Sequence, residues 1–202
     1  MSKTPESETD ENLQAAVVEF LSHANAYDAD VASEIVEIIE THVSWVFLSG
    51  DRAYKLKRAV HFPYLDFSTL AAREAACEEE VRLNRRTAPD VYLGVVPVRR
   101  EASGDMRLGS GEGEVVEWLV EMRRFEQDGL FDRLAQVDGL RRKRMEALAD
   151  SIAAFHTGAE ISSARGGAQG TRMIIENNHA SFDLAPDGVF ETNAVPTLTE
   201  AS

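Results

Sequence analysis

Short apolar runs separated by turn residues predict a β-hairpin early in the chain. The first run, residues 44–48, is rich in β-branched and aromatic residues, and the second run covers residues 53–56. The residues between them, 49–52, include a glycine and are typical of a tight connection. Side chains two residues apart on a strand share a face, so Lys55 and Lys57 are expected on one face of this hairpin. A solvated sheet face or a site for an anion would explain these two cations.

Three further segments have the pattern of strands. The apolar residues of 34–40 fit either a helix or a strand, and the hairpin that follows favours a strand. Residues 92–98 and 114–122 are mainly apolar, and the polar, Gly-rich residues 99–113 between them are expected to form a turn region. Residues 34–122 are therefore predicted to form an antiparallel sheet of about five strands, interrupted by one helix.

The interrupting helix is predicted over residues 69–86, with Ser68 as its N-cap. Because successive helical residues are about 100° apart, one side of this helix is mainly apolar. That side contains Leu70, Cys77, Val81 and Ala88. Glu74 and Glu80 flank it, whereas Glu79 lies on the far side. We therefore expect Glu80 to lean towards the sheet and Glu79 to face solvent.

Other segments have less regular patterns. Residues 1–9 are polar and are expected to be disordered, and Asp10 is placed to cap a helix over residues 11–23. Residues 58–67 contain a proline and several aromatic side chains, and they are predicted to form a connecting loop.

Helices are predicted to follow the sheet, over residues 129–136 and 140–156, with one more short element at 173–178. The sequence thus predicts an α+β fold in three parts. These parts are a tail and helix (1–30), a sheet lobe with one long helix (31–124) and a helical region with a frayed end (125–202).

Composition limits the classes of partner. The 202 residues have a formal net charge of −14, which argues against a nucleic-acid partner and is compatible with a cationic small-molecule substrate. Cys77 is the only cysteine, so neither an internal disulfide nor a cysteine metal cluster is expected. Residues 1–11 have the pattern of neither a signal peptide nor a membrane span, so we expect a cytoplasmic protein with no membrane partner.

Six strings of the sequence together resemble one known family. They are residues 40–48, 53–58, 65–70, 77–86, 92–98 and 120–125. These strings are similar to the N-terminal part of the aminoglycoside-phosphotransferase-like proteins, most closely the bacterial branch often fused to a P-loop ATP-binding domain. The resemblance covers roughly residues 31–155. It implies the small lobe of a protein-kinase-like fold, followed by the first helices of an incomplete helical lobe.

The resemblance also implies a nucleotide site with ATP and Mg²⁺. Lys55 would hold the α- and β-phosphates, and Lys57 is the alternative if the strand register differs by two. A glutamate of the long helix would orient that lysine. Glu80 is favoured by its position on the helix, and Glu74 and Glu78 are the next candidates.

Two further residues belong to this expected site. The Ser44 hydroxyl, in the loop over residues 41–44, would reach phosphate oxygens, although that loop lacks the glycines usual at this place. Met122 lies in the segment 121–124, whose backbone would pair with adenine.

The chain departs from the family where catalysis is expected. None of the five histidines has an aspartate two residues later, so the His-x-Asp catalytic segment is absent from these residues, and no catalytic or metal-binding residue is assigned. No Walker-type phosphate loop occurs either. We expect a truncated gene product of the phosphotransferase family that binds nucleotide weakly. The family would transfer phosphate from ATP to a small hydroxylated substrate, and we expect that this chain by itself does not. The alternatives are a non-catalytic nucleotide-binding or regulatory module and a purely structural domain.

Overall fold

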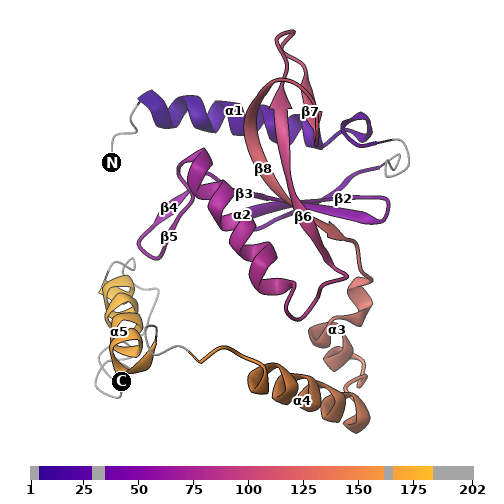
Figure 1. Cartoon of the computed structure of the whole chain (residues 1–202), viewed down its shortest axis with the longest axis vertical. Coiled ribbons are helices and arrows are strands. Elements are labelled where there is room, and N and C mark those ends of the chain that lie inside the picture. Colours follow the sequence, from indigo (N-terminus) through magenta and orange to yellow (C-terminus); the bar gives the residue numbers. More distant parts are fainter. Residues whose placement is uncertain (1–4, 29–34, 162–165, 184–202) are drawn as a thin grey trace. The chain divides into compact units, whose positions relative to one another are not determined.

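The computed structural model describes residues 5–28, 35–161 and 166–183. The chain divides into two compact units, residues 1–149 and residues 150–202. The described part of the first unit contains every strand discussed below, and Figure 1 shows its curled sheet with α2 lying across it.

The main sheet has six strands in the order β1-β2-β3-β8-β6-β7, and every neighbouring pair is antiparallel. Its strands are β1 (Glu37–Glu40), β2 (Ser44–Ser49), β3 (Arg52–Lys57), β6 (Tyr92–Arg100), β7 (Met106–Leu108) and β8 (Glu114–Arg123). The predicted antiparallel sheet is confirmed, but with six strands, because β7 forms inside the region expected to be a turn. A small separate sheet pairs β4 (His61–Phe62) with β5 (Leu65–Asp66) inside the predicted loop.

The predicted hairpin is confirmed as β2 and β3. Gly50 at the turn has a φ of 52°, a conformation that glycine adopts without a Cβ penalty. β1 is shorter than predicted, because residues 35 and 36 precede the strand, while residue 34 lies outside the described residues.

The described helices are α1 (Pro5–Leu21), α2 (Leu70–Asn84), α3 (Phe131–Gln136), α4 (Arg142–Thr157) and α5 (Gly167–Asp183), with short 3₁₀ turns at Ala24–Ala26 and Gln127–Gly129. The helices predicted over residues 129–136 and 140–156 correspond to α3 and α4. The short element predicted at 173–178 is wrong in extent, since α5 is a 17-residue helix.

Two predicted helix caps are wrong. Asp10 lies inside α1, which begins at Pro5, so the predicted disorder of residues 5–9 is also wrong. Thr69, not Ser68, caps α2, because its hydroxyl accepts a hydrogen bond from the Ala72 N–H at 3.2 Å. The Ser68 hydroxyl instead donates to Asp66 Oδ1 at 2.6 Å.

Each face of the sheet packs against one helix. On one face, Val17 and Leu21 of α1 join a core that includes Phe47, Tyr54 and Leu56. On the other face, Cys77 and Val81 of α2 pack on residues such as Leu48, Ala53 and Val120. The alternation of side chains along β2 and β3 produces both cores, because neighbouring residues point to opposite faces. Lys55 and Lys57 share their strand face with Ala53 and therefore point to the α2 side.

Candidate functional site

Lys55 and Lys57 meet the same carboxylate. Lys55 Nζ lies 2.9 Å from Glu80 Oε1, and Lys57 Nζ lies 2.6 Å from Glu80 Oε2. The predicted contact between Lys55 and Glu80 is therefore confirmed. The sequence left open whether Lys55 or Lys57 pairs with the helix glutamate. In the structure both lysines do, because each oxygen of Glu80 accepts a hydrogen bond from one of them.

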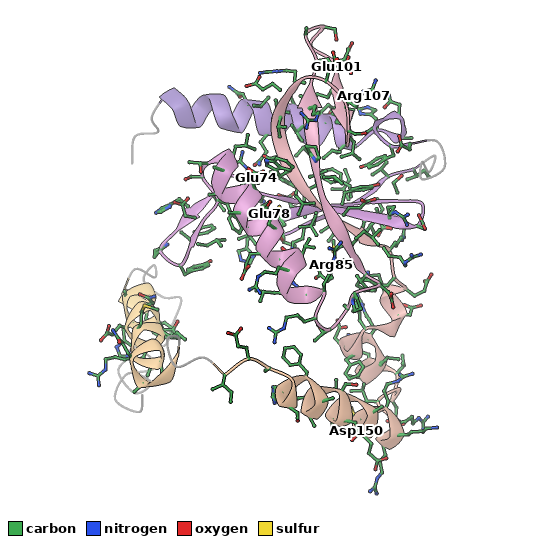
Figure 2. The ribbon with its side chains drawn as sticks, viewed as in Figure 1. Glu74, Glu78, Arg85, Glu101, Arg107 and Asp150 are labelled. Carbon is green, nitrogen blue, oxygen red and sulfur yellow. The ribbon has the colours of Figure 1, made fainter. Side chains whose placement is uncertain are left out.

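The position of Glu80 on α2 also agrees with the helical pattern. Glu79, one residue earlier, faces outward and pairs with Arg82 at 2.6 Å. Figure 2 shows Glu74 and Glu78 elsewhere along α2, and Glu78 is exposed. Of the three glutamates considered as partners, the structure thus brings Glu80 to the lysines.

Burial differs sharply among the three charged side chains. Lys55 is 30% exposed, Glu80 is 14% exposed and Lys57 is 6% exposed. Burial by itself raises the pKa of the Glu80 carboxyl, but the hydrogen bonds from Lys57 and Lys55 outweigh it, so the net shift of this pKa is downward. Glu80 is therefore ionised at neutral pH, and two ammonium groups against one carboxylate leave one positive charge unbalanced.

A cavity of about 340 Å³ opens beside Lys55 and Glu80. Its apolar wall includes Ile39, Val43, Val46, Leu48, Tyr92, Met122 and Phe125. Ser44, Lys55 and Glu80 supply polar groups to the same cavity, whereas Lys57 does not line it. A hollow of about 460 Å³ beside α1 is larger, but none of the predicted site residues lines it. The structure therefore gathers four of the predicted site residues around one cavity: Ser44, Lys55, Glu80 and Met122. Lys57 does not line this cavity and contacts Glu80 instead.

Ser44 has a polar atom without a partner. The residue is 2% exposed, and its Oγ makes no hydrogen bond within the described part of the chain. The backbone around it is held in place, because the Ser44 N–H donates to Thr41 Oγ1 at 3.0 Å and the Thr41 N–H donates to the Ser44 carbonyl at 2.8 Å. A buried hydroxyl with unused hydrogen-bonding capacity at a cavity wall suits a polar ligand.

A second buried ion pair, which was not predicted from the sequence, lies near the site. Arg73 Nε donates to both oxygens of Glu117 at 2.9 Å, and these side chains are 3% and 1% exposed. Gln14 of α1 donates to Glu117 at 2.8 Å and to the Lys57 carbonyl at 3.0 Å. The available signal was the place of Arg73 on α2, four residues before Cys77 on the buried side. This network fixes the end of β3 that holds Lys57.

A divalent metal has no evident ligand set here. Among residues 5–28, 35–161 and 166–183, no group of three or more His, Cys, Asp or Glu side chains is placed to hold a metal ion. The Mg²⁺ expected from the resemblance stays a prediction, because Mg²⁺ that is bound together with a nucleotide needs only one or two carboxylates beside the phosphate oxygens. Within the same residues, no helix is long and apolar enough to cross a bilayer.

Comparisons with known proteins find relatives without an assigned activity. The chain is 32% identical over 125 residues to uncharacterized proteins of Mycobacterium bovis and Mycobacterium tuberculosis. The match covers 62% of this chain and 23% of each relative, so it spans less than a quarter of these curated proteins. No protein-family model and no solved structure matches the chain.

Proposed function

We propose that the cavity beside Lys55 is a nucleotide-binding site that takes ATP with its phosphates towards Lys55. The observation that supports this most directly is the Lys55 ammonium, partly exposed at the cavity and held 2.9 Å from Glu80. An ammonium on a strand can be aimed at phosphate oxygens, and the unbalanced positive charge favours an anion. The unpartnered Ser44 hydroxyl would donate a further hydrogen bond to a phosphate oxygen.

The apolar wall of the cavity suits a flat, apolar group such as a purine base. Val46, Leu48 and Met122 offer apolar side-chain surface there. The backbone N–H groups of Arg123 and Arg124 already donate to the Val91 and Asp51 carbonyls, both at 2.8 Å. In this proposal, Met122 therefore contributes its side chain, and the base is held by contacts with its faces.

In this proposal the 202 residues bind ATP but do not transfer its phosphate. Transfer in related folds needs an aspartate that accepts the hydroxyl proton and ligands for the metal, and the sequence has no His-x-Asp segment. ATP-dependent transfer to a small hydroxylated substrate is proposed only for a longer protein of the aminoglycoside-phosphotransferase-like type. With Mg-ATP and a panel of aminoglycosides, we expect no substrate-stimulated ADP release from this chain. Turnover that disappears in Lys55→Ala would contradict this expectation.

The binding test is a thermal shift with increasing ATP. A ligand at about ten times its dissociation constant stabilises the folded state by about 1.4 kcal/mol. For a domain of this size that corresponds to a rise in Tm of about 3–6 °C. Lys55→Ala should abolish the shift, whereas Glu79→Ala, on the outer side of the same helix, should retain it. The absence of any shift at millimolar ATP in the wild-type chain would reject nucleotide binding and favour a structural role for the Lys55–Glu80 pair.

A further inference from the structure

An ion pair connects two parts of the wall of the cavity beside Lys55. Arg124 follows β8 and lines this cavity, and its guanidinium donates to Glu37 Oε2 on β1 at 3.1 Å. Glu37 shares a strand face with Ile39, which lines the same cavity. Two strands, β2 and β3, lie between β1 and β8 in the sheet. The pair therefore joins parts of the wall that the strand ladder does not join directly.

The two sides of this contact are held unequally. Arg124 is anchored, because its backbone N–H donates to the Asp51 carbonyl at 2.8 Å. β1 is an edge strand whose four residues are all exposed, and within the described residues its one strand partner is β2. At the far end of β1, Glu40 lies 2.7 Å from Arg58, and neither of these two residues lines the cavity. The ion pair at the cavity is thus a direct tie between the edge strand and the segment after β8.

We propose that Glu37 and Arg124 are positioning residues, which hold β1 in place so that Ile39 forms part of the apolar wall for the nucleotide base. This inference rests on the proposed nucleotide site. Without the pair, the bound ligand would have to order β1 itself, and this cost lowers the affinity. Arg124 acts through Glu37 and β1, and its charge is neutralised by that partner, so it does not serve as a phosphate ligand.

The test compares full-length proteins of equal net charge by titration calorimetry with ATP. Glu37→Gln/Arg124→Gln removes the pair, and Glu37→Arg/Arg124→Glu exchanges its two charges. The side chains of Arg124 and Glu37 are 39% and 56% exposed, and exposed pairs contribute modestly. The first variant should therefore bind ATP about threefold more weakly than the wild type. The second should bind within about 1.5-fold of the wild type, because the ion pair forms again in the opposite sense.

Salt and a distant pair provide two further readouts. Salt screens exposed charges, so the affinity ratio between the wild type and Glu37→Gln/Arg124→Gln should approach one from about 0.05 M to about 0.5 M NaCl. Arg107→Gln/Glu101→Gln is the matched control. It removes an exposed pair of 3.0 Å whose members do not line this cavity, and it should bind ATP as the wild type does. Circular-dichroism melting checks folding, which surface substitutions of this kind normally preserve.

Four results would overturn the inference. Unchanged affinity in Glu37→Gln/Arg124→Gln would mean that β1 is held without the pair. A charge-exchanged variant that binds no better than this one would mean that Arg124 contacts the ligand itself. An affinity ratio that does not change with salt would mean that the two side chains act by packing and not by charge. A wild-type chain that does not bind ATP would reject the proposed function and this inference together, whereas the other three results leave nucleotide binding intact.

Discussion

Arg73→Met tests the energetic importance of the network near the site. The change removes the guanidinium whose Nε lies 2.9 Å from both oxygens of Glu117, while the carboxylate stays buried at 1% exposure. Methionine fills most of the volume of the arginine stem, so the change tests charge and hydrogen bonding more than packing.

The expected loss follows from what remains around Glu117. The carboxylate keeps hydrogen bonds from Gln14 Nε2 at 2.8 Å and from the Trp118 N–H at 2.9 Å, but it has no cation. Breaking a buried ion pair in this way typically costs about 3–5 kcal/mol. The Phe67 carbonyl also loses the Arg73 hydrogen bond of 3.0 Å, which adds to the loss. The melting temperature should fall by about 6–20 °C.

The assay is urea unfolding followed by the fluorescence of Trp45 and Trp118, which lie on β2 and β8. Arg107→Met is the matched control, because its partner Glu101 lies at 3.0 Å but the two side chains are 60% and 36% exposed. Both residues are visible on the β6–β7 hairpin in Figure 2. A surface pair of this kind contributes about 0–1 kcal/mol.

Replacing both members should be less harmful than replacing one. Arg73→Met/Glu117→Leu leaves no isolated buried charge, so part of the stability should return. A loss below about 1 kcal/mol in Arg73→Met, comparable to the control, would refute the view that this pair is an energetic anchor of the fold. A double variant less stable than both single variants would refute the reasoning about the unpaired carboxylate.

Three further outcomes are expected. The folded-state pKa of Glu80 lies below its ordinary 4.5, so its contribution to stability is present above pH 4.5 and is lost as the pH falls below that value. The stability difference between wild type and Glu80→Gln should therefore shrink in acid unfolding experiments below about pH 4.5, and a constant difference would contradict this. Burial raises the pKa of the Cys77 thiol to about 12, so a thiol reagent should react with it only after unfolding; rapid reaction with the native protein would show that this packing is wrong. Gly113→Ala should destabilise the β6–β8 region, measured by chemical denaturation, because its Cβ would lie 2.5 Å from the Arg100 carbonyl oxygen; unchanged stability would mean that this turn relaxes freely.

The local pattern was sufficient to predict part of the site. Alternation along β3 predicts that Lys55 and Lys57 share a face, and the helical repeat predicts that Glu80, not Glu79, leans towards the sheet. The structure confirms both expectations. Nucleotide binding itself stays a prediction, because the contact between these side chains does not identify a ligand.

Two other features, β7 and the start of α1, were not predicted from the local sequence pattern. β7 is three residues long and pairs with β6 inside a polar, Gly-rich segment, so backbone pairing with a neighbour decides it, not an apolar run. α1 begins at Pro5 although its first turns are highly polar. In both places the residues within a short stretch of sequence predict a turn or a disordered segment, whereas the structure has a strand or a helix.

The sequence alone determined the alternation of faces in the β2–β3 hairpin and the side of α2 that carries Glu80, because these properties depend on the repeat of one element. The tertiary structure decided that one carboxylate serves two lysines, and that Lys55 reaches the cavity while Lys57 does not line it. It also decided that Gln14, Arg73 and Glu117, more than 40 residues apart in sequence, form one buried network. Such contacts depend on the distance and orientation between elements, and no periodicity within a single element contains that information.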